Sequence, residues 1–195
     1  MSKGEATREA ILDQALERAS VVGLSGISIG ELAAALKLSK SGLFAHFGSK
    51  EKLALDMLER AAQRFIEHVL VPAIREPRGE PRVRALFERW LAWGQRAGGC
   101  IFLQLGAEFD DQPGVVRDAL VKSQRDWQST LREAARISIR EGHFRAALDP
   151  EQFGFEMYSL MLGFHHFHRL LDDPASVRRL RAAFEGLLER ARTQT

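Results

Sequence analysis

Apolar residues recur along this chain with the 3.6-residue spacing of amphipathic helices, and the strict alternation typical of strands is absent. In the first such segment, Leu12, Leu16 and Ala19 share one face. The pattern predicts an all-α fold. In chain order, the first five expected helices cover about residues 7–22, 29–36, 39–47, 50–74 and 83–96. A long helix then starts at the cap and proline of 110–113 and ends at about residue 141, and the last two helices cover about 150–171 and 174–192.

Capping residues set the expected ends of these helices. Gly23 can adopt the left-handed conformation that closes the first helix. Ser28 and Glu31 form a capping-box pair that opens the second helix, and Ser39 and Ser49 can cap the third and the fourth. Later starts and stops are expected at the polar connection 75–82, Gly98-Gly99, the cap and early proline of 110–113, Gly142, Asp149 and Asp173-Pro174.

The first fifty residues are predicted to form three helices, of which the last two are short and joined by a tight turn. This is a helix-turn-helix arrangement, in which the third helix enters the major groove of DNA. Leu43 and Phe47 would face the three-helix core and hold that helix at its angle. Small residues at its start, Ser39, Ser41 and Gly42, would let the backbone approach phosphates.

Charge alone does not decide between a DNA-binding module and a purely structural one. The formal net charge is only +2, and residues 1–60 hold eight basic and eight acidic residues. From Lys37 to Lys52, however, four lysines face one acid, which gives this segment a local charge of +3. Any affinity for nucleic acid must therefore come from this local patch.

Residues 7–58 resemble the DNA-binding domain of the TetR family of bacterial transcriptional regulators. The resemblance rests on the opening S-I-G-E-L-A, on L-S-K-S-G-L-F-A-H-F and on the S-K-E-K-L that follows, all in order. It implies an all-helical homodimer with a larger C-terminal ligand domain. The family usually has a tyrosine at the position of Phe44, and its hydroxyl typically contacts a phosphate; Phe44 cannot donate that hydrogen bond.

From these motifs and the resemblance we expect a helix-turn-helix domain over 1–48, a connecting helix over 50–74, and a ligand-binding and dimerisation domain over 75–195. The partners would be a palindromic double-stranded DNA operator and a small, largely apolar effector that releases it, so that the protein would act as a repressor. The residues expected at the DNA are Ser28, Lys37, Ser39, Lys40, Ser41, Gly42, Phe44, His46 and Lys50.

The last two long helices are apolar over most of their circumference, which indicates that they are covered on several sides. One broad face carries Phe153, Met157, Leu160, Met161, Phe164, His168 and Leu171, whereas Phe155, Leu162 and Phe167 fall outside it. The final helix has a similar seam of Leu180, Phe184, Leu187 and Leu188. We expect a homodimer through these two helices as a four-helix interface; the alternative is that all these side chains fill one subunit's core.

Large apolar groups on the middle helices predict a ligand pocket, because such sites are concave and mostly apolar with a few polar groups. Plain core packing is the alternative for each of them. The candidates are Trp90, Trp93, Phe102, Gln104, Phe109, Gln124, Trp127, Leu131, Tyr158, Phe164 and His165.

Two residue types leave further sensing roles open. Cys100 could respond to oxidants, although a lone cysteine in an apolar segment is more often a small buried hydrophobe. His165 and His168 share a helix face with the spacing of half a metal site, but no matching ligands are evident, and His166 points elsewhere. We therefore expect no metal and no cofactor.

The remaining function classes are less well supported. No phosphate loop, H-E-x-x-H or G-x-S-x-G motif is present, which argues against an enzyme. An architectural DNA-binding protein without a ligand would need a strongly basic surface, which the balanced charge disfavours. The single cysteine and the absence of any apolar run near 20 residues or of a signal-peptide core predict a soluble cytoplasmic protein without membrane contact.

Overall fold

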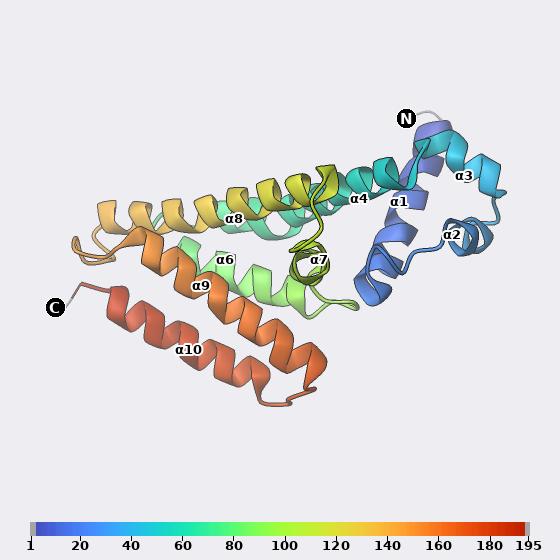
Figure 1. Ribbon diagram of the computed structural model, residues 1–195. Helices are drawn as coiled ribbons and strands as arrows, with labels where there is room; N and C mark the ends of the chain where they lie inside the picture. Colours follow the sequence, from blue (N-terminus) through green and yellow to red (C-terminus); the bar gives the residue numbers. More distant parts are fainter. Residues whose placement is uncertain (1–2, 194–195) are drawn as a thin grey trace. The chain divides into compact units, whose positions relative to one another are not determined.

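The computed structural model describes residues 3–193 and is helical almost throughout (Figure 1). Within this range there is no strand, and one isolated bridge pairs Phe144 with Arg192. The expected all-α fold is confirmed; residues 1–2 and 194–195 of the expected domains lie outside the described residues. The elements are α1 (Lys3–Val22), α2 (Ile29–Ala35), α3 (Lys40–Phe47), α4 (Lys50–Phe65), η1 (Ile66–Leu70), α5 (Val71–Ile74), α6 (Glu80–Gly94), α7 (Ile101–Phe109), α8 (Val115–Arg140), α9 (Pro150–His165), η2 (His166–Leu170) and α10 (Ser176–Ala191).

The helices divide into two compact units. The first comprises Met1–Phe65 and Arg96–Ser123, and the second comprises Ile66–Gln95 and Gln124–Thr195. The short helix α7 therefore belongs to the same unit as the helix-turn-helix segment, although it lies far along the chain. The boundaries of the units fall where α4 passes into η1 and inside α8.

The first unit is built around α1, whose apolar face packs on α4. Asp13 on α1 forms ion pairs with Arg60 and Arg64 on α4, at 3.0 and 3.3 Å, beside this apolar contact. The core of the helix-turn-helix segment consists of Ile11, Leu12, Ala15, Leu16, Ala19, Leu32, Ala33, Leu43, Phe47, Leu53 and Met57, all of them buried.

Several helix ends differ from the predicted ones. α1 begins at Lys3 instead of residue 7, and α6 runs over Glu80–Gly94 instead of 83–96. The early start of α6 is possible because Pro81 lies in its first turn, where a missing N–H costs no hydrogen bond. Pro113, expected in the first turn of α8, precedes that helix, which begins at Val115.

Two predicted helices contain a π-helical turn that the sequence pattern does not indicate. The helix expected over 50–74 consists of α4, the π turn η1 and α5. The helix expected over 150–171 consists of α9 and the π turn η2. A π turn inserts an extra residue, so the helix faces after it are rotated relative to those before it.

In the second unit, α9 and α10 run side by side as an antiparallel pair (Figure 1). Helix α10 also packs on α6, where the buried rings of Phe87 and Phe184 stack with centroids 3.7 Å apart. Leu180, Phe184, Leu187 and Leu188, predicted as a seam of the final helix, are all buried here. They fill the core of the second unit, which is the alternative that the sequence left open for these four side chains.

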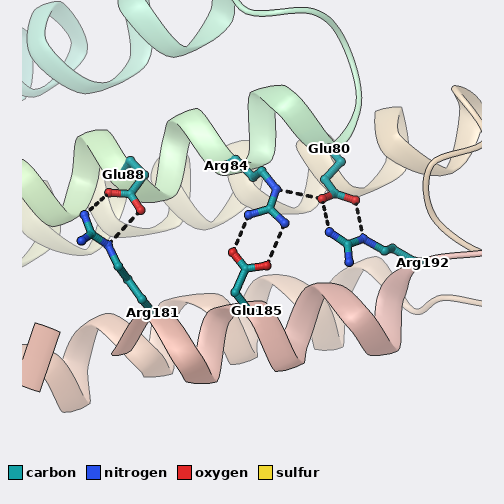
Figure 2. Close-up of polar contacts among 6 residues, drawn as sticks. All are labelled: Glu80, Arg84, Glu88, Arg181, Glu185 and Arg192. Atoms are coloured by element: carbon teal, nitrogen blue, oxygen red, sulfur yellow. Dashed lines mark hydrogen bonds and ion pairs between the residues drawn. The ribbon is translucent and has the colours of Figure 1, made fainter. Parts of the chain in front are cut away.

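A row of charged pairs joins α6 to the α10 segment along the same contact (Figure 2). Arg181 donates to Glu88 at 2.7 and 3.1 Å, and Arg84 donates to Glu185 at 2.5 and 2.8 Å. Glu80 accepts from both Arg84 and Arg192. The hydrogen bond from Arg192 is the main reason why the pKa of Glu80 is lowered.

The outer side of α9 and η2 remains apolar and exposed. Phe153, Met157, Met161 and Phe164 are buried, as the predicted inner face requires, whereas Leu171, assigned to the same face, is 54% exposed. Leu171 follows the π turn, which rotates it out of the register of the buried residues. The exposed apolar side chains of this segment are Phe155, Leu162, Phe167, Leu170 and Leu171.

Candidate nucleic-acid interface

Helices α2 and α3 are each fixed at their N-terminus by a serine. The Ser28 hydroxyl accepts from the Glu31 amide at 3.5 Å, and the Ser39 hydroxyl accepts from the Gly42 amide at 3.0 Å. Between them, Lys37 adopts a left-handed conformation with φ 55°, which makes the turn tight. The two serines are thus first of all capping residues, and their side chains are exposed at the same time.

Helix α3 is anchored through one side and presents the other to solvent. Leu43 and Phe47 are buried, with 1% and 6% of their surface exposed. Lys40, Ser41, Phe44 and Ala45 are exposed, whereas Gly42 and His46 are half-buried. The helix is therefore held rigidly while a mixed small, apolar and basic face stays accessible.

Gly30 on α2 makes room for Lys40 on α3. A Cβ built at Gly30 would lie 2.8 Å from Cε of Lys40, so a larger residue would displace the lysine. This contact gives the glycine of the S-I-G-E motif a role in orienting a basic side chain of the exposed face.

One of the four lysines that give the local charge of +3 has an ion-pair partner within the first unit. Nζ of Lys52 forms an ion pair with Asp56 at 2.6 Å, and the buried Asp56 also pairs with Arg8. Lys52 is thus held by an ion pair within the unit, with Asp56 shared between Lys52 and Arg8. The ammonium of Lys50 donates to the carbonyl of Ser25 at 3.3 Å and stays exposed, as do Lys37 and Lys40.

All nine residues predicted at the DNA lie on or beside α2, α3 and the start of α4 in one unit, and none of them is buried. The structure brings them to the same short segment. The fold adds one residue that sequence reasoning missed, Glu108 on α7.

Glu108 joins α7 to the turn that follows α1. Its carboxylate accepts from the amides of Leu24 at 2.9 Å and Ser25 at 2.5 Å. Gly23, with φ 75°, leaves room for it, since a Cβ there would lie 2.7 Å from Oε2 of Glu108. Glu108 is the one acid within the apolar stretch C-I-F-L-Q-L-G-A-E-F, which is the signal that could have marked it.

A second close approach lies next to this one. A Cβ at Gly98, which has φ 82°, would lie 1.9 Å from Oγ of Ser20 near the end of α1. Because backbone and side chain meet without intervening space, the segment leading into α7 packs directly on α1.

The predicted effector residues on α7 lie in the first unit. The ring of Phe102 meets Phe65 edge-on with centroids 6.1 Å apart. The buried Oε1 atom of Gln104 has no hydrogen-bond partner among the described residues, and Phe109 is half-buried. Helix α7 thus carries three candidate ligand residues together with Glu108.

The other candidates lie in the second unit, where an aromatic cluster forms between α6, α8 and α9. The rings of Trp127 and Tyr158 lie 5.1 and 5.6 Å from that of Trp90. The Tyr158 hydroxyl donates to Gln124 at 2.5 Å. Trp93, Leu131 and Phe164 are also buried, on α6, α8 and α9 respectively.

The histidines of 165–168 do not gather metal ligands. Among the described residues, no group of three or more His, Cys, Asp or Glu side chains could hold a metal ion. His168 stacks on Phe164 and its Nδ1 lies 3.2 Å from Oγ of Ser176. Burial is the main cause that lowers the pKa of His165, which favours the neutral imidazole. Cys100 is buried.

No helix in the described part of the chain combines the length and the apolar character needed to cross a membrane.

Two family models together cover most of the chain. Residues 11–57 match the model for bacterial regulatory proteins of the TetR family. Residues 79–184 match the model for the tetracyclin repressor-like C-terminal domain. No curated protein matches the sequence.

Solved structures share the fold over the full chain. A TetR transcriptional regulator from Chloroflexus aurantiacus J-10-fl is 27% identical, with all of both chains covered and a TM-score of 0.88. A TetR-family regulator from Cytophaga hutchinsonii is 21% identical, with 100% of this chain and 99% of that chain covered and a TM-score of 0.87. AibR in complex with isovaleryl coenzyme A and operator DNA is 22% identical, with 95% and 99% covered and a TM-score of 0.77.

Proposed function

The chain belongs to the TetR family of bacterial regulatory proteins, and we propose that it is a dimeric repressor that binds a palindromic operator and is released by a small, largely apolar effector. The observation that carries the proposal is the exposed face of α3. This helix is anchored by Leu43 and Phe47, capped by Ser39 and flanked by Lys40 and Lys50. A rigid, basic and accessible helix of this kind fits the major groove.

The contacts with DNA divide into two kinds. Lys37, Lys40 and Lys50 are exposed and would neutralise phosphates, and the half-buried His46 would also reach the backbone. Ser41 and Gly42 add little bulk, so the start of α3 can approach the DNA closely. Ser28 and Ser39 cap their helices, and their exposed hydroxyls would contribute to the backbone contacts.

Dimerisation is proposed through α9, η2 and the outer side of α10. The support is the row of exposed apolar side chains on α9 and η2, which a monomer would leave in water. A two-fold axis beside this segment would pair it with the same segment of a second copy, as isologous interfaces require.

Effector binding is proposed at the apolar candidates, on α7 in the first unit and in the aromatic cluster of Trp90, Trp127 and Tyr158 in the second. The buried Oε1 of Gln104 supports the α7 candidates, because a buried acceptor without a partner among the described residues is poised for a ligand donor. The relative AibR was solved with an acyl coenzyme A and operator DNA together, which shows both partners on that protein.

Glu108 would pass an effector signal on to the DNA-binding helices. Because α7 carries both the candidate ligand residues and Glu108, a shift of α7 changes the hydrogen bonds to Leu24 and Ser25. The effector must bind the DNA-incompetent form better than the competent one for release to follow.

Operator binding by charge variants tests the proposed function. An operator is selected from random duplex DNA with the full-length protein, and affinity is then measured by fluorescence anisotropy at several salt concentrations. Lys40→Ala and Lys50→Ala should each weaken binding and lower the salt slope by about one. Lys52→Ala is the matched control, since Asp56 already pairs with that ammonium. Unchanged affinity and slope in the first two variants would contradict the assigned face.

A further inference from the structure

The centre of the exposed face of α3 is small and apolar. Ala45 lies two residues from both Leu43 and Phe47, which are buried, so it lies on the opposite side of the helix. Next to it, the ring of Phe44 is 45% exposed. The helix therefore presents a methyl group and an aromatic ring. A helix that recognises bases through hydrogen bonds would be expected to carry long polar side chains there.

Phe44 is only partly covered within the subunit, since 45% of its surface stays exposed. Leu43 and Phe47 already fill the core side of α3, with 1% and 6% exposed. A phenyl ring also cannot donate to a phosphate. An exposed ring at this position is thus useful for contact with another apolar group.

The major groove offers one such group on its base edges, the C5-methyl of thymine. Lys40 at the start of α3 and Lys50 just beyond it are exposed and would draw the helix to DNA. The short side chain of Ser41 and the lack of one at Gly42 would let the apolar face come within contact distance of the bases.

We propose that Phe44, with Ala45 beside it, is a specificity-determining residue that contacts a thymine C5-methyl in each operator half-site. This inference rests on the proposed function and names what one part of its DNA-binding face recognises. It predicts a required thymine in each half-site, recognised through its methyl group and not through a hydrogen bond.

Replacement of single thymines by deoxyuridine tests this directly, because deoxyuridine pairs like thymidine and lacks only the methyl group. With the full-length protein and its selected operator, each thymine is replaced in turn and the affinity is measured by anisotropy. At one thymine of each half-site the replacement should weaken binding about fourfold, the factor expected when one methyl group is no longer buried. The other thymines should tolerate it.

Variants then assign the methyl contact to Phe44. Phe44→Ala should bind the thymine operator more weakly and lose the deoxyuridine effect, as a double-mutant cycle requires for two groups in contact. Phe44→Tyr keeps the ring and should keep the effect, and Ser41→Ala should keep it as well. Thermal melting followed by circular dichroism shows whether each variant remains folded, and the deoxyuridine scan itself needs no variant.

The outcomes separate this inference from the function on which it rests. A selected operator that tolerates deoxyuridine at every thymine, or a folded Phe44→Ala variant with the full deoxyuridine effect, would overturn the inference alone. Failure to select any DNA sequence would overturn both.

Discussion

The hydrogen bonds from Leu24 and Ser25 to Glu108 allow the most detailed prediction. Glu108→Ala removes an acceptor at 2.9 Å from one amide and at 2.5 Å from the other. Hydrogen bonds to charged groups contribute about 1.5–3 kcal/mol each. Ser25 is exposed, so water can replace one of the two bonds, whereas Leu24 is buried. The net loss should therefore be close to a single such bond, about 2 kcal/mol.

Hydrogen exchange measures this loss at the affected amides. A local destabilisation of about 2 kcal/mol speeds exchange of the Leu24 amide about thirtyfold, provided that exchange occurs by local opening. Mass spectrometry of a peptide covering residues 20–27 reports it, and a peptide from α10 should not change. The operator affinity of the variant should fall several-fold, because the turn that orients α2 and α3 on α1 is loosened.

Glu108→Gln is the matched control, since the amide keeps one oxygen acceptor and the size of the side chain but loses the charge. Its effect on exchange should lie between those of the wild type and Glu108→Ala. Unchanged exchange at residues 20–27 in Glu108→Ala, with unchanged operator affinity, would refute the coupling of α7 to the helix-turn-helix segment.

Three further predictions concern the second unit and the dimer. Trp127→Ala should lower the free energy of unfolding in urea by well under the about 3–5 kcal/mol expected for truncation of a core tryptophan, and it should weaken the release of DNA in response to the effector. Trp90→Ala, at a fully buried residue, should lower the free energy of unfolding by the whole amount. Equal losses in the two variants would indicate that Trp127 serves only in core packing. Leu162→Asp should halve the mass found by light scattering with the fold intact, and Val115→Asp, similarly exposed, should not change it; two unchanged masses would argue against the proposed interface. Because the pKa of Glu80 is lowered, its ion pairs stabilise the fold above about pH 4.5 and that contribution is lost as pH falls through the lowered value. Glu80→Gln should thus lower the free energy of unfolding at pH 7 by up to about 1 kcal/mol per pair, and with it the melting temperature, and both effects should be much smaller at pH 3; an equal effect at both pH values would contradict this.

Helix ends could be predicted from sequence wherever one side chain decides them. Ser39 and Asp149 accept backbone amides as N-caps, and Gly23 and Gly142 adopt φ values of 75° and 74° after their helices. These devices act between residues a few positions apart, so the local sequence contains the whole interaction.

The π turns could not be predicted in this way. The apolar pattern over 150–171 is that of one continuous helix, yet His166–Leu170 forms a π turn. Whether an extra residue is inserted depends on what packs against the helix, which the periodicity of a single segment does not contain. The same effect turned Leu171 from the expected buried face to solvent.

The candidate sites differ in how local they are. The residues proposed to bind DNA fall within a short stretch, so their grouping on α2, α3 and the start of α4 followed from the sequence. The contact of Glu108 with Leu24 spans 84 positions and depends on tertiary packing. The charge count over 37–52 did not show that Lys52 is held in an ion pair, because its partner Asp56 lies just outside that window.

Hydroxyl-radical footprinting of the full-length protein on its selected operator tests the central claim most directly. A dimer that places α3 of each subunit in a major groove should protect two half-sites related by two-fold symmetry, with centres about 34 Å or a related spacing apart. Lys40→Ala should weaken both protected regions alike. A single asymmetric footprint, or protection without sequence preference, would contradict the account.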